Sequence, residues 1–138
     1  MSVAPDRLPP QALEFLTERH LATLTTLRSD GSPHVVPVGF TWDNELLVAR
    51  VITGRSSAKV RQVRADGRAV LCQVDRRRWL ALEGTATVEE DGAAVRDAEE
   101  RYAVRYREPR PNPQRVVVVV RVTLVLGDST VLTPDVTT

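Results

Sequence analysis

The sequence predicts a mainly β domain of the α+β class, in which six antiparallel strands form a small barrel with short helices at its ends. Three observations lead to this fold. The chain has 138 residues, the size of one domain with one modest core, so we expect a single domain over residues 1–138. Apolar residues make up 42% and charged residues 27%, which are ordinary fractions for a folded chain. Runs with a hydrophobic period of two alternate with turn residues and with segments of helical spacing.

A helix and then three strands open the predicted domain. Pro9 and Pro10 suit the first turn of a helix that continues to about Arg19. The period then changes to two, and β-branched or aromatic residues fill the runs 21–27, 35–42 and 46–52. Turn residues at 30–33 and 43–44 separate these runs, so we expect an antiparallel meander.

Two helices and three strands are expected beyond the meander. Ser56 or Ser57 can cap a helix that ends near Asp66, and Asp91 can cap another that continues to Tyr106. Strands are expected over residues 69–75, 79–88 and 115–126. Three prolines make residues 108–113 an extended connector. Residues 1–7 and 133–138 are polar, so we expect frayed ends around an ordered core of about residues 8–132.

The last strand predicts a homodimer. Residues 116–120 are five consecutive valines, and a strand that is apolar on both faces must be covered on both faces. The barrel interior can cover one face. A second copy of the chain is the economical cover for the other.

Composition excludes several classes of function. The net charge of +1 provides no global field for nucleic acid or anionic lipid, and no run approaches the roughly 20 apolar residues of a membrane span. The single cysteine, Cys72, allows no internal disulfide, and no signal peptide is apparent, so we expect a cytoplasmic protein. His20 and His34 are far apart, and CxxC, HExxH and GxSxG motifs are absent, which gives no support to a metal site or a hydrolytic triad.

Two segments suggest a site for a ligand that has both a phosphate group and a flat ring. Residues 50–59 (RVITGRSSAK) place a glycine turn, hydroxyls and cations at a helix start, where backbone N–H groups bind anions. The alternative is that a serine merely caps the helix. Pro37 and Gly39 leave a gap in a strand ladder where a flat ring can lie, and the alternative is an edge strand protected by its proline. Residues 76–79 (RRRW) are interpreted as a solvated turn before a core tryptophan.

Longer segments carry a family resemblance. They are residues 18–27, 30–41, 49–53 with Ser57 and Lys59, 74–84 and 96–127, of which 97–113 (DAEERYAVRYREPRPNP) is the most distinctive. They resemble the pyridoxamine phosphate oxidase-like split β-barrels, in particular the F420-dependent branch, and within it the biliverdin reductases of actinobacteria. The resemblance implies an intertwined homodimer with two non-covalent cofactor sites at the subunit interface.

The resemblance also implies which residues bind the cofactor. Arg50, Ser57 and Lys59 match phosphate-binding positions, and residues 36–38 match the strand that supports the ring. The expected cofactor-binding residues are Val36, Pro37, Val38, Arg50, Val51, Thr53, Arg55, Ser56, Ser57, Lys59, Trp79, Tyr106 and Arg110.

The resemblance implies hydride transfer from reduced F420 to a conjugated acceptor, with biliverdin to bilirubin as the favoured reaction and no obligatory catalytic side chain. An FMN-binding oxidase or reductase is one alternative. A non-catalytic module for a flavin, deazaflavin or haem-derived ligand is another. Gln62 departs from the asparagine common in relatives. The chain lacks the C-terminal extension of the true pyridoxamine phosphate oxidases, which argues against vitamin B6 oxidation.

Overall fold

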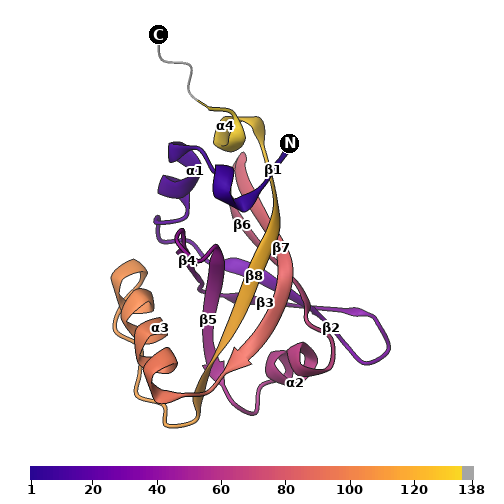
Figure 1. The fold of residues 1–138 in the computed structure, drawn as a ribbon, viewed down its shortest axis with the longest axis vertical. Helices are drawn as coiled ribbons and strands as arrows, with labels where there is room; N and C mark the ends of the chain where they lie inside the picture. The colour runs from indigo at the N-terminus through magenta and orange to yellow at the C-terminus, as the bar shows by residue number, and fades with distance from the viewer. Residues whose placement is uncertain (135–138) are drawn as a thin grey trace.

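Eight antiparallel strands form one open sheet in residues 1–134, the part of the chain that the computed structural model describes (Figure 1). The strands are β1 (Ser2–Val3), β2 (Ala22–Leu27), β3 (Pro33–Val38), β4 (Thr41–Asp43), β5 (Val48–Gly54), β6 (Arg68–Asp75), β7 (Arg78–Glu89) and β8 (Arg115–Gly127). Their order is β3-β2-β6-β7-β8-β5-β4, and β1 pairs with β8. The mainly β, antiparallel prediction is therefore confirmed.

The closed barrel of six strands is wrong in both strand number and closure. The end strands β3 and β4 each pair with one neighbour only, so the sheet stays open. The strand predicted over residues 35–42 is divided because the chain leaves the ladder at Gly39 and Phe40. The backbone N–H and C=O groups of Phe40 instead bond to the hydroxyl of Tyr106, a partner that strand periodicity cannot indicate.

The N-terminus supplies the eighth strand and is not frayed. Ser2 and Val3 pair with Leu126 and Val125 of β8. The backbone amide of Gly127 donates to the carbonyl of Met1 at 3.1 Å, which extends the pairing to the first residue. Of the C-terminal end that was expected to fray, residues 135–138 lie outside the described residues.

Helices surround the sheet in three places (Figure 1). The 3-10 helix η1 (Pro5–Arg7) and the helices α1 (Pro10–Phe15) and α4 (Ser129–Leu132) lie at one end, whereas α2 (Ala58–Ala65) packs on β2 and β7. The helix α3 (Gly92–Arg105) packs on β4, β5 and β8. Among the described residues, no helix combines the length and apolar character that crossing a membrane requires.

The valine run of β8 is covered largely by this chain itself. Val116, Val118 and Val120 belong to the hydrophobic core and are fully buried. Val117 points the other way and is only 1% exposed. The helix α3 packs on β8, where Glu99 of α3 bonds to Arg115 at the start of the strand. Val117 therefore does not need the second copy that the sequence suggested as the economical cover of this face, and only Val119 in the run is partly exposed.

Candidate functional site

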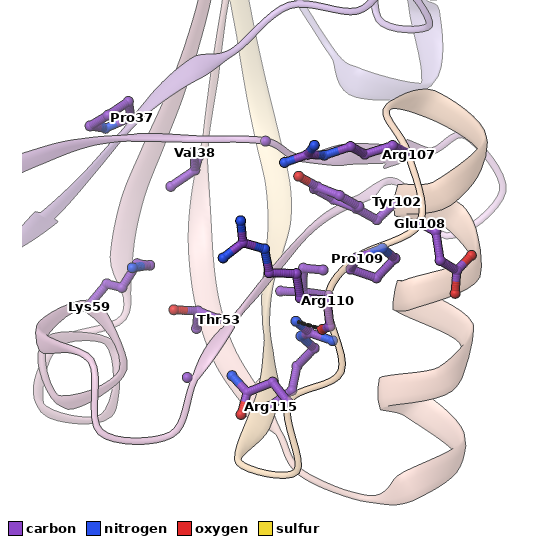
Figure 2. Close-up of a pocket in the computed structure, with 14 residues that line it drawn as sticks. Pro37, Val38, Thr53, Lys59, Tyr102, Arg107, Glu108, Pro109, Arg110 and Arg115 are labelled. Carbon is purple, nitrogen blue, oxygen red and sulfur yellow. Dashed lines mark hydrogen bonds between the residues drawn. The ribbon is translucent and has the colours of Figure 1, made fainter.

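A pocket of about 350 Å³ opens where the ends of β3 and β5 meet the start of α2 and the segment that follows α3 (Figure 2). We call it the central pocket, and we call residues 107–115 the arm. The strand ends and α2 contribute Pro37, Val38, Gly39, Ile52, Thr53, Gly54 and Lys59. The helix α3 and the arm contribute Tyr102, Arg107, Glu108, Pro109, Arg110, Asn112 and Arg115.

One wall of the central pocket has the donors that a phosphate requires. Ser57 is the N-cap residue of α2, yet its side chain makes no capping hydrogen bond. Its hydroxyl instead accepts from Thr53 Oγ1 at 3.3 Å. Lys59 lies half-buried beside them, and no carboxylate in residues 1–134 forms a salt bridge with its ammonium group. Hydroxyls, an ammonium group and the free N–H groups of a helix start thus gather at one place, which is the chemistry of an anion site.

Burial affects the charge of Lys59. Removal from water disfavours the ammonium form, so the pKa of Lys59 is lowered from its ordinary value. A bound anion would offset that cost. The residues at this wall therefore fit a phosphate-bearing ligand.

A second wall offers a surface for a flat ring. Pro37, Val38 and Gly39 line the central pocket at the end of β3, which is an edge strand as the alternative interpretation held. A Cβ atom at Gly39 would lie 3.1 Å from Cε2 of Tyr106 and 3.2 Å from Cε2 of Tyr102. Glycine at this position therefore lets both tyrosine rings support the strand end closely. Val36 packs against the hydrophobic core instead of lining the pocket.

Ser57 does not line the central pocket itself, but its hydroxyl contacts that of Thr53, which does. Four other predicted residues of the 50–59 segment lie outside the pocket. Nη1 of Arg50 lies 2.9 Å from Oδ2 of the buried Asp43, and Val51 is part of the core. Nε of Arg55 lies 3.0 Å from Oε1 of Glu90. Ser56 is exposed, and its carbonyl accepts from Arg61. The structure thus brings together Thr53, Ser57 and Lys59 but not Arg50, Val51, Arg55 or Ser56.

Of the remaining three candidates, Trp79 and Tyr106 have structural contacts and Arg110 lines the central pocket. Trp79, at the start of β7, donates its backbone N–H to Asp128 at 3.1 Å, which places it beside α4 and away from the central pocket. Tyr106 supports the pocket floor from below through Gly39 and does not line the cavity. Arg110 does line it.

The arm is the part of the site that residue patterns alone missed. Arg107 and Arg110 lie three residues apart in a proline-rich segment, and this pair of cations is the sequence feature that could have indicated a ligand site. Nη1 of Arg115 bonds to Oε2 of Glu99 at 2.6 Å, and its Nη2 donates to the carbonyl of Arg110 at 2.7 Å. The backbone of the arm is thereby tied to α3.

The histidines lie outside the central pocket. Nε2 of His20 lies 2.9 Å from Oε1 of Glu18, but Arg78 bonds to both Glu18 and Asp75 beside it. Hydrogen bonds from Arg78 lower the pKa of Glu18 to about 2. This cluster already contains its own cation, so we interpret it as an ion-pair network that holds the loop after α1. Nδ1 of His34 is buried and has no hydrogen-bond partner within the described part of the chain.

Comparison with known proteins places this chain in a family. The chain belongs to the pyridoxamine 5'-phosphate oxidase family, whose model matches residues 8–127, and the expected family is thus confirmed. It is 60% identical over 126 residues to a Mycobacterium tuberculosis protein named F420H(2)-dependent biliverdin reductase, covering 91% of this chain and 92% of the relative.

Solved structures share the fold. One named F420 Reductase is 27% identical, with a TM-score of 0.66 over 82% of this chain and 94% of its own. General Stress Protein 26 from Bacillus anthracis is 19% identical, with a TM-score of 0.70 over 91% of this chain and 93% of its own. The latter similarity concerns the fold alone.

Proposed function

We propose that this protein is an F420-dependent reductase that converts biliverdin to bilirubin. The observation that carries the proposal is the 60% identity, over 91% of the chain, to a protein named for that activity. The central pocket supports it, because a half-buried lysine and a helix start face a strand end that is free of bulky side chains. The structural similarity to a protein named F420 Reductase agrees with the same cofactor.

The two walls of the central pocket bind different parts of the cofactor in this proposal. F420, when bound in its reduced form, supplies the hydride. Lys59, Thr53 and the N-terminus of α2 hold the phosphate of the cofactor. Pro37, Val38 and Gly39 support its ring system and fix the orientation at which it meets the acceptor. Ser57 contributes a hydroxyl that is not committed to capping.

The proton that completes the reduction comes from water in this proposal. The titratable side chains that line the central pocket are those of Lys59, Tyr102, Glu108 and three arginines, and neither histidine is among them. None of these residue types ordinarily exchanges a proton near neutral pH in the way histidine does. Catalysis by this chain then consists mainly of positioning two conjugated ring systems.

We also propose a homodimer in the cytoplasm. A hollow on the outer face of β5, β7 and β8 is lined by the partly exposed Val119 of β8 and by Leu46, which is 65% exposed in the turn before β5. A second copy that packs there would remove this apolar surface from water. Cys72 has no partner for a disulfide in this chain, which suits a reducing compartment.

The test is a pair of binding titrations followed by turnover. Purified protein is titrated with F420 and, separately, with FMN, and then supplied with reduced F420 and biliverdin. We expect saturable F420 binding, weaker FMN binding and formation of bilirubin. Tight FMN binding without F420 binding would favour the flavin alternative, and F420 binding without turnover would favour the non-catalytic one.

A further inference from the structure

Two arginines on the arm have charges that no side chain within residues 1–134 neutralises. The side chains of Arg107 and Arg110 form no salt bridge and no hydrogen bond within residues 1–134. Both line the central pocket, and their guanidinium groups extend into it (Figure 2). Glu108 lies between them in sequence, but its carboxylate points away from the cavity (Figure 2).

Other arginines close to the site are already engaged. Arg50 and Arg101 pair with the buried Asp43, and Arg115 pairs with Glu99. Arg105 is buried and donates to Glu18, Phe40 and Gln73. Arg107 and Arg110 are therefore the arginines at the central pocket that are available to a ligand.

The arm holds these two arginines in place without a ligand. Its start follows Tyr106, whose hydroxyl is bonded to the backbone of Phe40. Its end is fixed where the amide of Arg55 donates to the carbonyl of Gln114 at 2.8 Å. Three prolines at 109, 111 and 113 restrict the backbone between these points. Little backbone entropy is then lost when a ligand binds.

We propose that Arg107 and Arg110 bind the two carboxylates of the acceptor, which gives Arg110 a role other than the cofactor contact that the family resemblance implies, and that this carboxylate site is separate from the phosphate site at Lys59. Guanidinium groups match carboxylates in a planar, two-bond geometry. Lys59 lies across the central pocket from the arm, so the two kinds of anion meet different walls (Figure 2). The substrate class is accordingly a conjugated dicarboxylic acid. This inference rests on the proposed function, and it assigns the specificity of the acceptor to the arm.

The test compares biliverdin with biliverdin dimethyl ester, which has the same ring system without the charges. Binding of each compound is titrated to the unmodified protein, to Arg107→Ala/Arg110→Ala and to Arg77→Ala. Arg77 is an exposed arginine of the turn between β6 and β7, so Arg77→Ala removes one positive charge away from the central pocket, against two removed at the pocket in the double variant. The affinity of each variant for F420 is measured alongside.

We expect the unmodified protein and Arg77→Ala to prefer the diacid by roughly two- to thirtyfold, as expected of two partly exposed ion pairs. In the double variant this preference disappears, while F420 affinity changes less than about twofold. Equal affinity of the unmodified protein for diacid and diester would overturn the inference and leave the proposed function standing. A fall in F420 affinity as large as the fall in diacid affinity would overturn the separation of the two sites. Absence of both F420 binding and turnover in the unmodified protein would overturn the proposed function itself.

Discussion

The phenolic oxygen of Tyr106 lies 3.1 Å from the backbone nitrogen of Phe40 and 3.0 Å from its carbonyl oxygen. This contact joins the end of α3 to the break between β3 and β4. The same ring supports Gly39, which lines the central pocket. The position of the pocket floor thus depends on a residue that does not line the cavity.

Tyr106→Phe is expected to lower the free energy of unfolding by about 1–3 kcal/mol, because it leaves the backbone N–H of Phe40 without its partner, whereas the Phe40 carbonyl still accepts from Arg105. Tyr102→Phe is the matched control, since the Tyr102 hydroxyl makes no hydrogen bond within residues 1–134. Urea denaturation of both variants measures the difference. Equal stability of the two variants would contradict the role given to the Tyr106 hydroxyl.

Substitutions in the valine run separate folding from assembly. Val118 is fully buried in the core, so Val118→Asp places an unpaired charge there and should prevent folding. Val119 is partly exposed on the outer face of the sheet. Val119→Asp should keep the fold but convert the proposed dimer to a monomer. Light scattering and circular dichroism measure both effects. A monomeric unmodified protein would rule out the dimer.

Neither histidine is expected to act as an obligatory proton donor. His20 bonds to Glu18 within the ion-pair network, and His34 lies outside the residues that line the central pocket. Turnover of His20→Ala and His34→Ala at saturating F420 and biliverdin should each fall by less than about a hundredfold, the loss typical of a missing general acid. A larger fall in a variant that remains folded would identify a proton donor.

The affinity for F420 should decline at alkaline pH. Burial lowers the pKa of Lys59, so the ammonium form is lost at a pH below that of an exposed lysine. Affinity is full below this lowered pKa and falls as the pH rises through it. Without ligand, the free energy of unfolding instead rises as the pH increases from the lowered pKa of Lys59 to its pKa in the unfolded chain. In that range only the unfolded chain binds the proton. Titrations of the unmodified protein and Lys59→Arg, whose charge persists to higher pH, check this. An identical decline in both would exclude Lys59 as its cause.

The sequence predicted individual strands better than it predicted whether the sheet closes into a barrel. Periodicity located the long strands β7 and β8, because alternation along a strand depends only on which face is buried. It could not predict the break at Gly39 and Phe40, because the bonding partner is Tyr106, 66 residues away. It also missed β1, since two residues that pair with Leu126 and Val125 are too few to show a period.

The same contrast applies to the site. Lys59, Thr53 and Ser57 gather as expected because a strand, a tight turn and a helix start are close in sequence. Arg50 does not join them, because its side chain pairs with Asp43, and no pattern in the segment indicates that partner. Long-range ion pairs decide which of several arginines remain free for a ligand.

The most direct test of the central claim is the dissociation constant of F420 for the unmodified protein, for Lys59→Ala and for Arg64→Ala. Arg64 lies on the same helix but is exposed and pairs with Glu90, so its removal controls for net charge. A charge-assisted phosphate contact is worth about 1.5–3 kcal/mol, so Lys59→Ala should weaken binding roughly ten- to a hundredfold. Arg64→Ala should change it less than about twofold. Equal affinity of Lys59→Ala and the unmodified protein would contradict the assignment of the phosphate site.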